Sequence, residues 1–108
     1  MLDKFEAHNQ KNDEDVPTGG RVRGVGLAID WQDGPIGKVE GDERLPPNGA
    51  FVETVIAACV QRLEFYQASR FACDENHIAI MHLNGALEVL NDRTKKREAR
   101  GVEGTHKV

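Results

Sequence analysis

No segment of the sequence has the pattern of an export signal or of a membrane anchor. Residues 1–14 are polar and contain no apolar stretch of the kind that marks a signal peptide. No apolar run approaches the ~20 residues that a membrane span needs. We therefore expect a cytosolic protein without a membrane partner, in which Cys59 and Cys73 are reduced thiols. These two cysteines and the four histidines have no metal-ligand spacing, so no metal site is predicted.

Recognisable catalytic motifs are also missing. Gly24-Val25-Gly26 lacks the third glycine of a dinucleotide fingerprint, and residues 34–38 are too short for a phosphate-binding P-loop. No Ser, His and Asp set has a family signature. Cys59 stands at an apolar helical position, where a small core residue is expected rather than a nucleophile. We predict no catalytic residue, no cofactor and no enzymatic reaction.

Positive charge is in deficit overall but concentrated near the end of the chain. The net charge is −4, which argues against non-specific binding of DNA or RNA, because such binding needs a basic surface. Residues 93–107 nevertheless hold six of the 14 lysines and arginines. A small anionic ligand in a local basic pocket is compatible with this distribution.

The first half of the chain has the pattern of a small sheet. With 108 residues one domain is expected. Residues 1–18 are polar and acidic and are predicted to be a flexible arm that ends at Gly19-Gly20. Apolar residues alternate from Val25 to Trp31, which predicts a half-buried strand, and residues 36–40 suit a short second strand. A β-rich segment is therefore expected over 19–47, within a single domain that spans 19–108.

The second half has the pattern of two helices. A helix is predicted over 48–68 with Asn48 as its N-cap, and a second over 74–100 after a break at residues 69–73. Ile80, Leu83, Leu87 and Leu90 recur at spacings of three and four, as in a coiled coil. The second helix is the longer one, and its overhanging end is cationic. The expected fold is α+β: a small N-terminal β-sheet, a long C-terminal antiparallel helical hairpin that oligomerises through its helices, and a tail at 101–108.

Several residue patterns suit a phosphorylated ligand, each with a plainer alternative. Arg93, Arg97 and Arg100 share one helix face and have the side chains that bind phosphate oxygens bidentately, but a solvated helix end would look the same. The following glycine-rich tail suits either close approach to a ligand or a frayed terminus. Tyr66 can stack on a base, whereas Phe65 is expected in the core. Residues 19–24 can hold phosphate through backbone N–H groups, or can lead flexibly into a strand.

Four blocks of the sequence resemble the first type of phage Thoeris anti-defence sponge proteins. They are Ile29-Asp30-Trp31-Gln32-Asp33-Gly34-Pro35, Pro47-Asn48-Gly49-Ala50-Phe51-Val52-Glu53, Arg62-Leu63-Glu64-Phe65-Tyr66-Gln67, and the segment from Arg93 through Arg97-Glu98-Ala99-Arg100-Gly101-Val102-Glu103-Gly104-Thr105-His106. The resemblance implies the sheet and hairpin just described, in a homodimer or a hexamer made of three dimers. It also implies a protein of the infected bacterial cytoplasm that captures glycocyclic ADP-ribose, the signal that Thoeris TIR enzymes make from NAD, without cleaving it.

The resemblance further implies where ligands bind. Tyr66, Asn76, Arg93 and Arg97 match the family's signal pocket, and Arg100 and Thr105 complete the candidate set. Related sponges of the CBASS system trap cyclic di- or trinucleotides, sometimes in a second pocket, for which Gly20, Arg21 and Arg23 are the candidates here. Two other functions stay open: a helical protein-interaction module without a nucleotide ligand, and an enzyme that degrades the signal.

Overall fold

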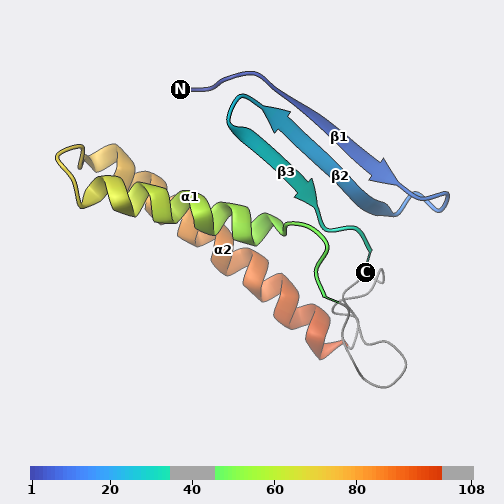
Figure 1. The fold of residues 1–108 in the computed structure, drawn as a ribbon. Coiled ribbons are helices and arrows are strands. Elements are labelled where there is room, and N and C mark those ends of the chain that lie inside the picture. Colours follow the sequence, from blue (N-terminus) through green and yellow to red (C-terminus); the bar gives the residue numbers. More distant parts are fainter. Residues whose placement is uncertain (35–45, 101–108) are drawn as a thin grey trace. The chain divides into compact units, whose positions relative to one another are not determined.

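The computed structural model describes residues 1–34 and 46–100, which form two compact units (Figure 1). The first unit contains the described residues up to Phe51 and is built on a sheet. The second, Val52–Arg100, is a helical hairpin. The predicted α+β class, with a sheet followed by a hairpin, is confirmed. That residues 19–108 act as one domain stays a prediction.

The sheet has three antiparallel strands in the order β1-β2-β3. They are β1 (Phe5–Lys11), β2 (Pro17–Gly24) and β3 (Leu27–Trp31). Val22 of the central strand stands opposite Ala7 on one side and Ile29 on the other, and it is only 9% exposed. Because side chains alternate between faces along a strand, Arg21 and Arg23 lie on the other face of the sheet from Val22.

The flexible arm predicted over residues 1–18 is wrong, because β1 and the start of β2 occupy half of it and the turn between them most of the rest. All seven residues of β1 are exposed, so this edge strand has none of the apolar alternation by which strands are recognised. Its pairing with β2 holds it instead. The acidic residues that suggested disorder form the turn between the strands, where the Asn12 carboxamide accepts hydrogen bonds from the N–H groups of Glu14 and Val16 at 2.9 and 3.0 Å.

Gly20 lies inside β2 and does not break the chain. A Cβ atom at this position would stand 2.5 Å from the carbonyl oxygen of His8 on β1. The glycine therefore permits close approach of the two strands. The strand predicted from Val25 begins at Leu27, because Val25 and Gly26 form the turn between β2 and β3.

Asn48 does not cap a helix, in contrast to the prediction, because its side chain is bound to the end of β3. Its carboxamide accepts from the N–H of Asp33 at 2.8 Å and donates to the Asp33 carbonyl at 2.7 Å. Ala50 extends the contact by donating to the carbonyl of Asp30 at 2.7 Å and accepting from the N–H of Gln32 at 3.0 Å. We call these interactions of residues 48–50 with residues 30–33 the clasp. The strand predicted over 36–40 lies outside the described residues.

The hairpin consists of α1 (Val52–Gln67) and α2 (Asp74–Ala99). The predicted break at 69–73 is confirmed, and Gln67 closes it by bonding both the N–H and the carbonyl of Cys73, at 2.9 and 3.0 Å. The predicted seam faces α1: Ile80, Leu83, Leu87 and Leu90 are all half-buried, and Val60 of α1 is 7% exposed. Half-buried Asn76, Thr94 and Arg97 continue the same spacing toward both ends of α2.

Candidate functional site

The predicted signal-binding residues lie at opposite ends of the hairpin. Tyr66 in the last turn of α1 and Asn76 in the first turn of α2 flank the connection between the helices. Arg93 and Arg97 belong to the last turns of α2, and Arg100 caps its end. At ~1.5 Å per residue, Asn76 and Arg93 are separated by about 25 Å along the helix. One chain does not bring the two groups together. Thr105 lies outside the described residues.

An aromatic cluster lies at the connected end of the hairpin, where the chain passes from α1 to α2. The Nε of Arg62 donates to the Tyr66 hydroxyl at 3.2 Å, and its guanidinium carbon lies 5.0 Å from the ring centres of both Phe65 and Tyr66. These distances are typical of cation–π contacts. Asn76 is oriented nearby by donating to the carbonyl of Phe71 at 3.3 Å. The cluster therefore offers rings and an amide beside a cation, which suits a nucleobase.

Two residues of this cluster differ from what the sequence suggested. Phe65 was expected in the core but is 54% exposed. Helical spacing makes this outcome understandable, because Phe65 falls between the positions that face α2. Arg62 was missed, although its spacing of three and four residues from Phe65 and Tyr66 places the three side chains on one helix face.

At the open end of the hairpin, formed by the start of α1 and the end of α2, Arg93 and Arg97 differ in their exposure to solvent. Arg93 is exposed and donates to the Glu53 carboxylate of α1 at 3.0 Å. Arg97, one turn further, is half-buried on the seam side of α2. Glu53 was not among the predicted site residues. Its pairing with Arg93 has no local sequence signal, because the two residues are 40 apart in the chain.

A shallow hollow of about 500 Å³ lies beside Glu53. It is lined by Glu53, Leu87, Glu88, Asn91 and Thr94. Two carboxylates and no cation line it, so it disfavours a phosphate group.

In the candidate second site on the sheet, the groups that can bind phosphate differ from those predicted. Arg23 is engaged with its own sheet: it donates to the Asp30 carboxylate at 2.7 Å and to the carbonyl of Ile29 at 2.8 Å. Because β2 is the central strand, its backbone groups face β1 and β3 and form no cradle for phosphate. Arg21 is exposed on the same face as Arg23. A phosphate at this site would depend on arginine side chains, not on backbone N–H groups.

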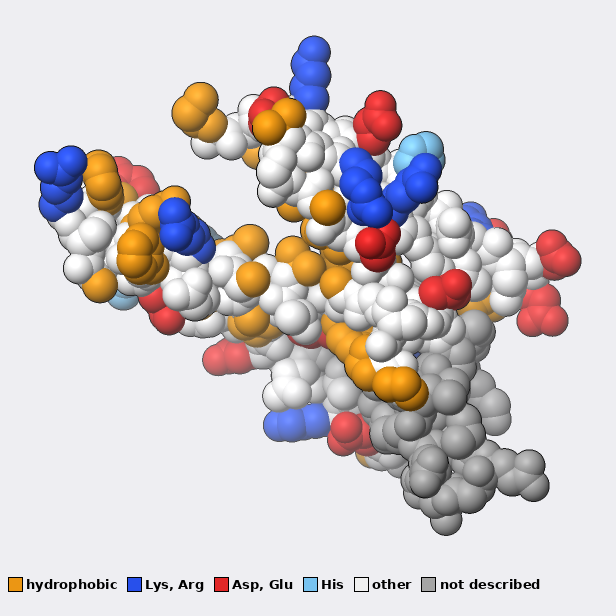
Figure 2. Space-filling model, viewed as in Figure 1, with side chains coloured by type: hydrophobic (Ala, Val, Ile, Leu, Met, Phe, Trp, Pro, Cys, Tyr) orange, Lys and Arg blue, Asp and Glu red, His pale blue; other side chains and the backbone are white. Residues whose placement is uncertain are grey.

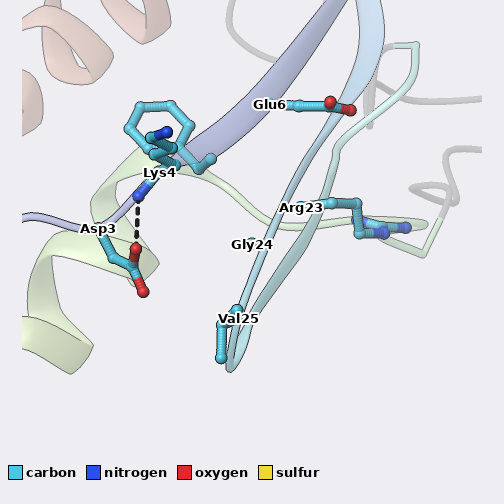
Figure 3. Close-up of a pocket in the computed structure, with 7 residues that line it drawn as sticks. Asp3, Lys4, Glu6, Arg23, Gly24 and Val25 are labelled. Carbon is cyan, nitrogen blue, oxygen red and sulfur yellow. Dashed lines mark hydrogen bonds between the residues drawn. The ribbon is translucent and has the colours of Figure 1, made fainter.

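The sheet also has a surface hollow near the start of β1 (Figure 3). Its lining residues are Asp3, Lys4, Phe5, Glu6, Arg23, Gly24 and Val25. Figure 3 shows Arg23 and Glu6 projecting to one side of the strands, with Asp3 and Lys4 on the other. The hollow has as many acids as bases, so its charge does not favour a particular ligand.

Two classes of site receive no support from the described residues. Within residues 1–34 and 46–100, no group of three or more His, Cys, Asp or Glu side chains is placed to hold a metal ion. In the same part of the chain, neither helix is both long and apolar enough to cross a membrane.

Comparison with known proteins assigns the hairpin to a protein family. Residues 24–95 match the family model described as Acb2/Tad1, hairpin domain. The chain belongs to this family. The match runs from the end of β2 into the last turns of α2, so it includes Tyr66, Asn76 and Arg93 and ends just before Arg97.

A curated relative supports the assignment. The chain is 52% identical over 59 residues to Thoeris anti-defense 1 of Bacillus phage SBSphiJ7. The aligned part is 55% of this chain and 42% of the relative, so the chain spans less than half of that protein's length. The resemblance identified from the four sequence blocks is confirmed.

Proposed function

We propose that this chain is a phage anti-defence protein that binds glycocyclic ADP-ribose in the cytoplasm of the infected host and sequesters it without cleavage. The observation that carries the proposal is the division of the hairpin into two complementary half-sites. One end offers aromatic rings and an amide, and the other offers arginines. A ligand with an adenine and two phosphates needs both kinds of group.

The separation of the half-sites implies that two subunits build one pocket. Two hairpins packed side by side in opposite directions place the connected end of one beside the open end of the other. Such a dimer creates two equivalent pockets, as two-fold symmetry requires. Arg93 and Arg97 of one subunit would hold the diphosphate, while Tyr66 of the other packs on the base and Asn76 bonds a ring edge or a ribose hydroxyl. Arg100 and Thr105 would complete the arginine side.

The surface of the hairpin supports such packing. Ile78, Met81 and Val89 of α2 are 52%, 60% and 68% exposed. Their helical spacing places them on the side of α2 opposite the seam that faces α1. Figure 2 shows hydrophobic side chains at the surface along the hairpin. None of the described side chains is fully buried, so there is little core in the described part of one chain. Pairing of hairpins would cover this apolar stripe.

A cyclic di- or trinucleotide is the proposed ligand of the second site. Arg21 and Arg23 share one face of the sheet, and several copies of Arg21 would converge on phosphates if three dimers assemble as a hexamer. Because Arg23 is already paired with Asp30, we assign the larger part of such binding to Arg21.

Sequestration is tested by trapping and release. The full chain is mixed with signal made by a Thoeris TIR enzyme and filtered, and the retained fraction is heated. We expect the filtrate to lose the signal and the heated fraction to return it intact. Return of a cleaved product would identify a degrading enzyme. Absence of heat in calorimetry with glycocyclic ADP-ribose and cyclic ADP-ribose isomers would favour a protein-interaction module instead.

A further inference from the structure

The ion pair between Glu53 and Arg93 joins the first turn of α1 to the last turns of α2. The Arg93 nitrogen and the Glu53 oxygen are 3.0 Å apart. The side chain of Arg93 is 58% exposed, whereas that of Glu53 is 34% exposed. Glu53 is therefore the more firmly placed partner, and it also stands at the positive end of the α1 dipole, which favours a carboxylate. The more exposed side chain of the pair is the arginine.

An exposed ion pair of this kind adds little to folding stability, because solvent screens it and ordering long side chains opposes it. The ion pair does restrict the Arg93 side chain to the conformations in which it reaches Glu53. A guanidinium has five N–H donors, so one nitrogen bound to Glu53 leaves the others available for a phosphate. An arginine that is already oriented loses less conformational freedom when the ligand arrives.

We propose that Glu53 is a positioning residue that holds Arg93 in the orientation in which it binds the phosphates of the signal. This inference rests on the proposed function, because it assigns a role toward the same pocket. Glu53 itself does not touch the ligand, since its negative charge would repel a phosphate.

Two variants separate orientation from charge. Glu53→Ala and Glu53→Gln both remove the negative charge, and any gain in electrostatic potential at the pocket is the same in both. Only the glutamine keeps an oxygen that accepts a hydrogen bond from Arg93. The difference between the two variants therefore reports the positioning contact alone.

The affinity of the full chain for glycocyclic ADP-ribose is measured by calorimetry. We expect Glu53→Gln to bind about twofold to tenfold more tightly than Glu53→Ala, the effect of one ordinary hydrogen bond. In an Arg93→Ala background the two variants should bind equally, because Glu53 acts through Arg93. Glu88→Ala and Glu88→Gln remove a neighbouring carboxylate of the same hollow and form the matched control pair; these two variants should bind equally.

The outcomes distinguish this inference from the function on which it rests. If the unmodified chain does not bind the signal, the proposed function fails. If it binds and the two Glu53 variants have equal affinities, the function stands and the positioning role is overturned. A difference that persists without Arg93 overturns it as well. Melting temperature and oligomeric state are recorded for each variant, so that a folding defect is recognised as such.

Discussion

The backbone of Gly49 runs directly against the end of β3. A Cβ atom added there would lie 2.6 Å from both the carbonyl carbon and the carbonyl oxygen of Trp31, and 2.7 Å from the carbonyl oxygen of Asp30. All three neighbours are backbone atoms, which cannot rotate away as a side chain can. The clasp therefore depends on the smallest residue at this position, between Asn48 and Ala50, which make its hydrogen bonds.

We predict that Gly49→Ala opens the clasp and destabilises the sheet unit by about 1–3 kcal/mol, the usual cost of overpacking. Trp31 is the one tryptophan of the chain and lies at the clasp, so its fluorescence reports the event directly. A urea titration followed by this signal measures the shift. Pro47→Ala at the exposed neighbouring position serves as the control. An unchanged midpoint in Gly49→Ala would show that the backbone contact is not maintained in solution.

Arg93 and Arg97 test the proposed pocket at the level of single side chains. A hydrogen bond to a charged group contributes about 1.5–3 kcal/mol, so alanine at either position should weaken signal binding roughly tenfold to a hundredfold. For Arg93 the melting temperature should hardly change, because its ion pair with Glu53 is largely exposed.

The matched control for the arginines is Lys95→Ala. It removes the same charge from an exposed position of the same helix. Calorimetry gives the affinities and thermal scanning gives the stabilities. If both arginine variants bind as tightly as the unmodified chain, the basic end of α2 is only a solvated helix end.

At the scale of elements, α2 is a helix with two different apolar faces. The seam of Ile80, Leu83, Leu87 and Leu90 packs toward α1, and the stripe of Ile78, Met81 and Val89 is exposed on the opposite side. Gly85 stands in line with this stripe, and a Cβ atom built there meets no atom within 4 Å. Helical glycine is unfavourable, so its presence in the middle of α2 weakens the isolated helix.

We therefore predict that Gly85→Ala stabilises a single hairpin by up to about 1 kcal/mol, the difference in helix propensity. The thermal midpoint at low protein concentration measures this effect. At high protein concentration, the sign of the change in thermal midpoint shows whether Gly85 lies in a contact between subunits. A variant that is less stable than the unmodified chain only when associated would place Gly85 in a close contact between helices of two subunits.

For the molecule as a whole, the proposed pocket requires two subunits. We expect a homodimer at micromolar concentration in light scattering, because pairing would cover the exposed stripe of α2. Replacing Met81 and Val89 together by glutamate places two charges in the contact and should yield monomers. The monomers should also lose signal binding, because neither half-site alone holds the ligand.

The control for dissociation adds two glutamates to α2 at positions outside the exposed stripe. Asn84→Glu with Asn91→Glu changes two exposed positions of α2 outside the stripe, and the dimer should persist. A monomeric unmodified chain that still binds the signal would contradict the composite pocket. In that case one chain would have to join its two half-sites by a rearrangement of the hairpin.

The hairpin and the chemistry of its ends could be predicted from the order of the residues alone. Apolar residues at spacings of three and four fix a helix and its buried face through local geometry, so the seam and the break before Asp74 were predictable. Arginines one turn apart, and an aromatic residue in line with another arginine, follow from the same periodicity. The four sequence blocks also identified the family.

Features that depend on partners distant in the chain became visible only in the folded protein. The edge strand β1 has no apolar pattern of its own, because pairing with β2 and not burial holds it. Asn48 had the chemistry of a helix cap, but the carboxamide binds Asp33, whose backbone groups are brought within reach by the sheet. Glu53 and Arg93 meet because two helices return on each other. The same antiparallel return separates Tyr66 from Arg93 by the length of a helix, and that separation cannot be read from local spacing.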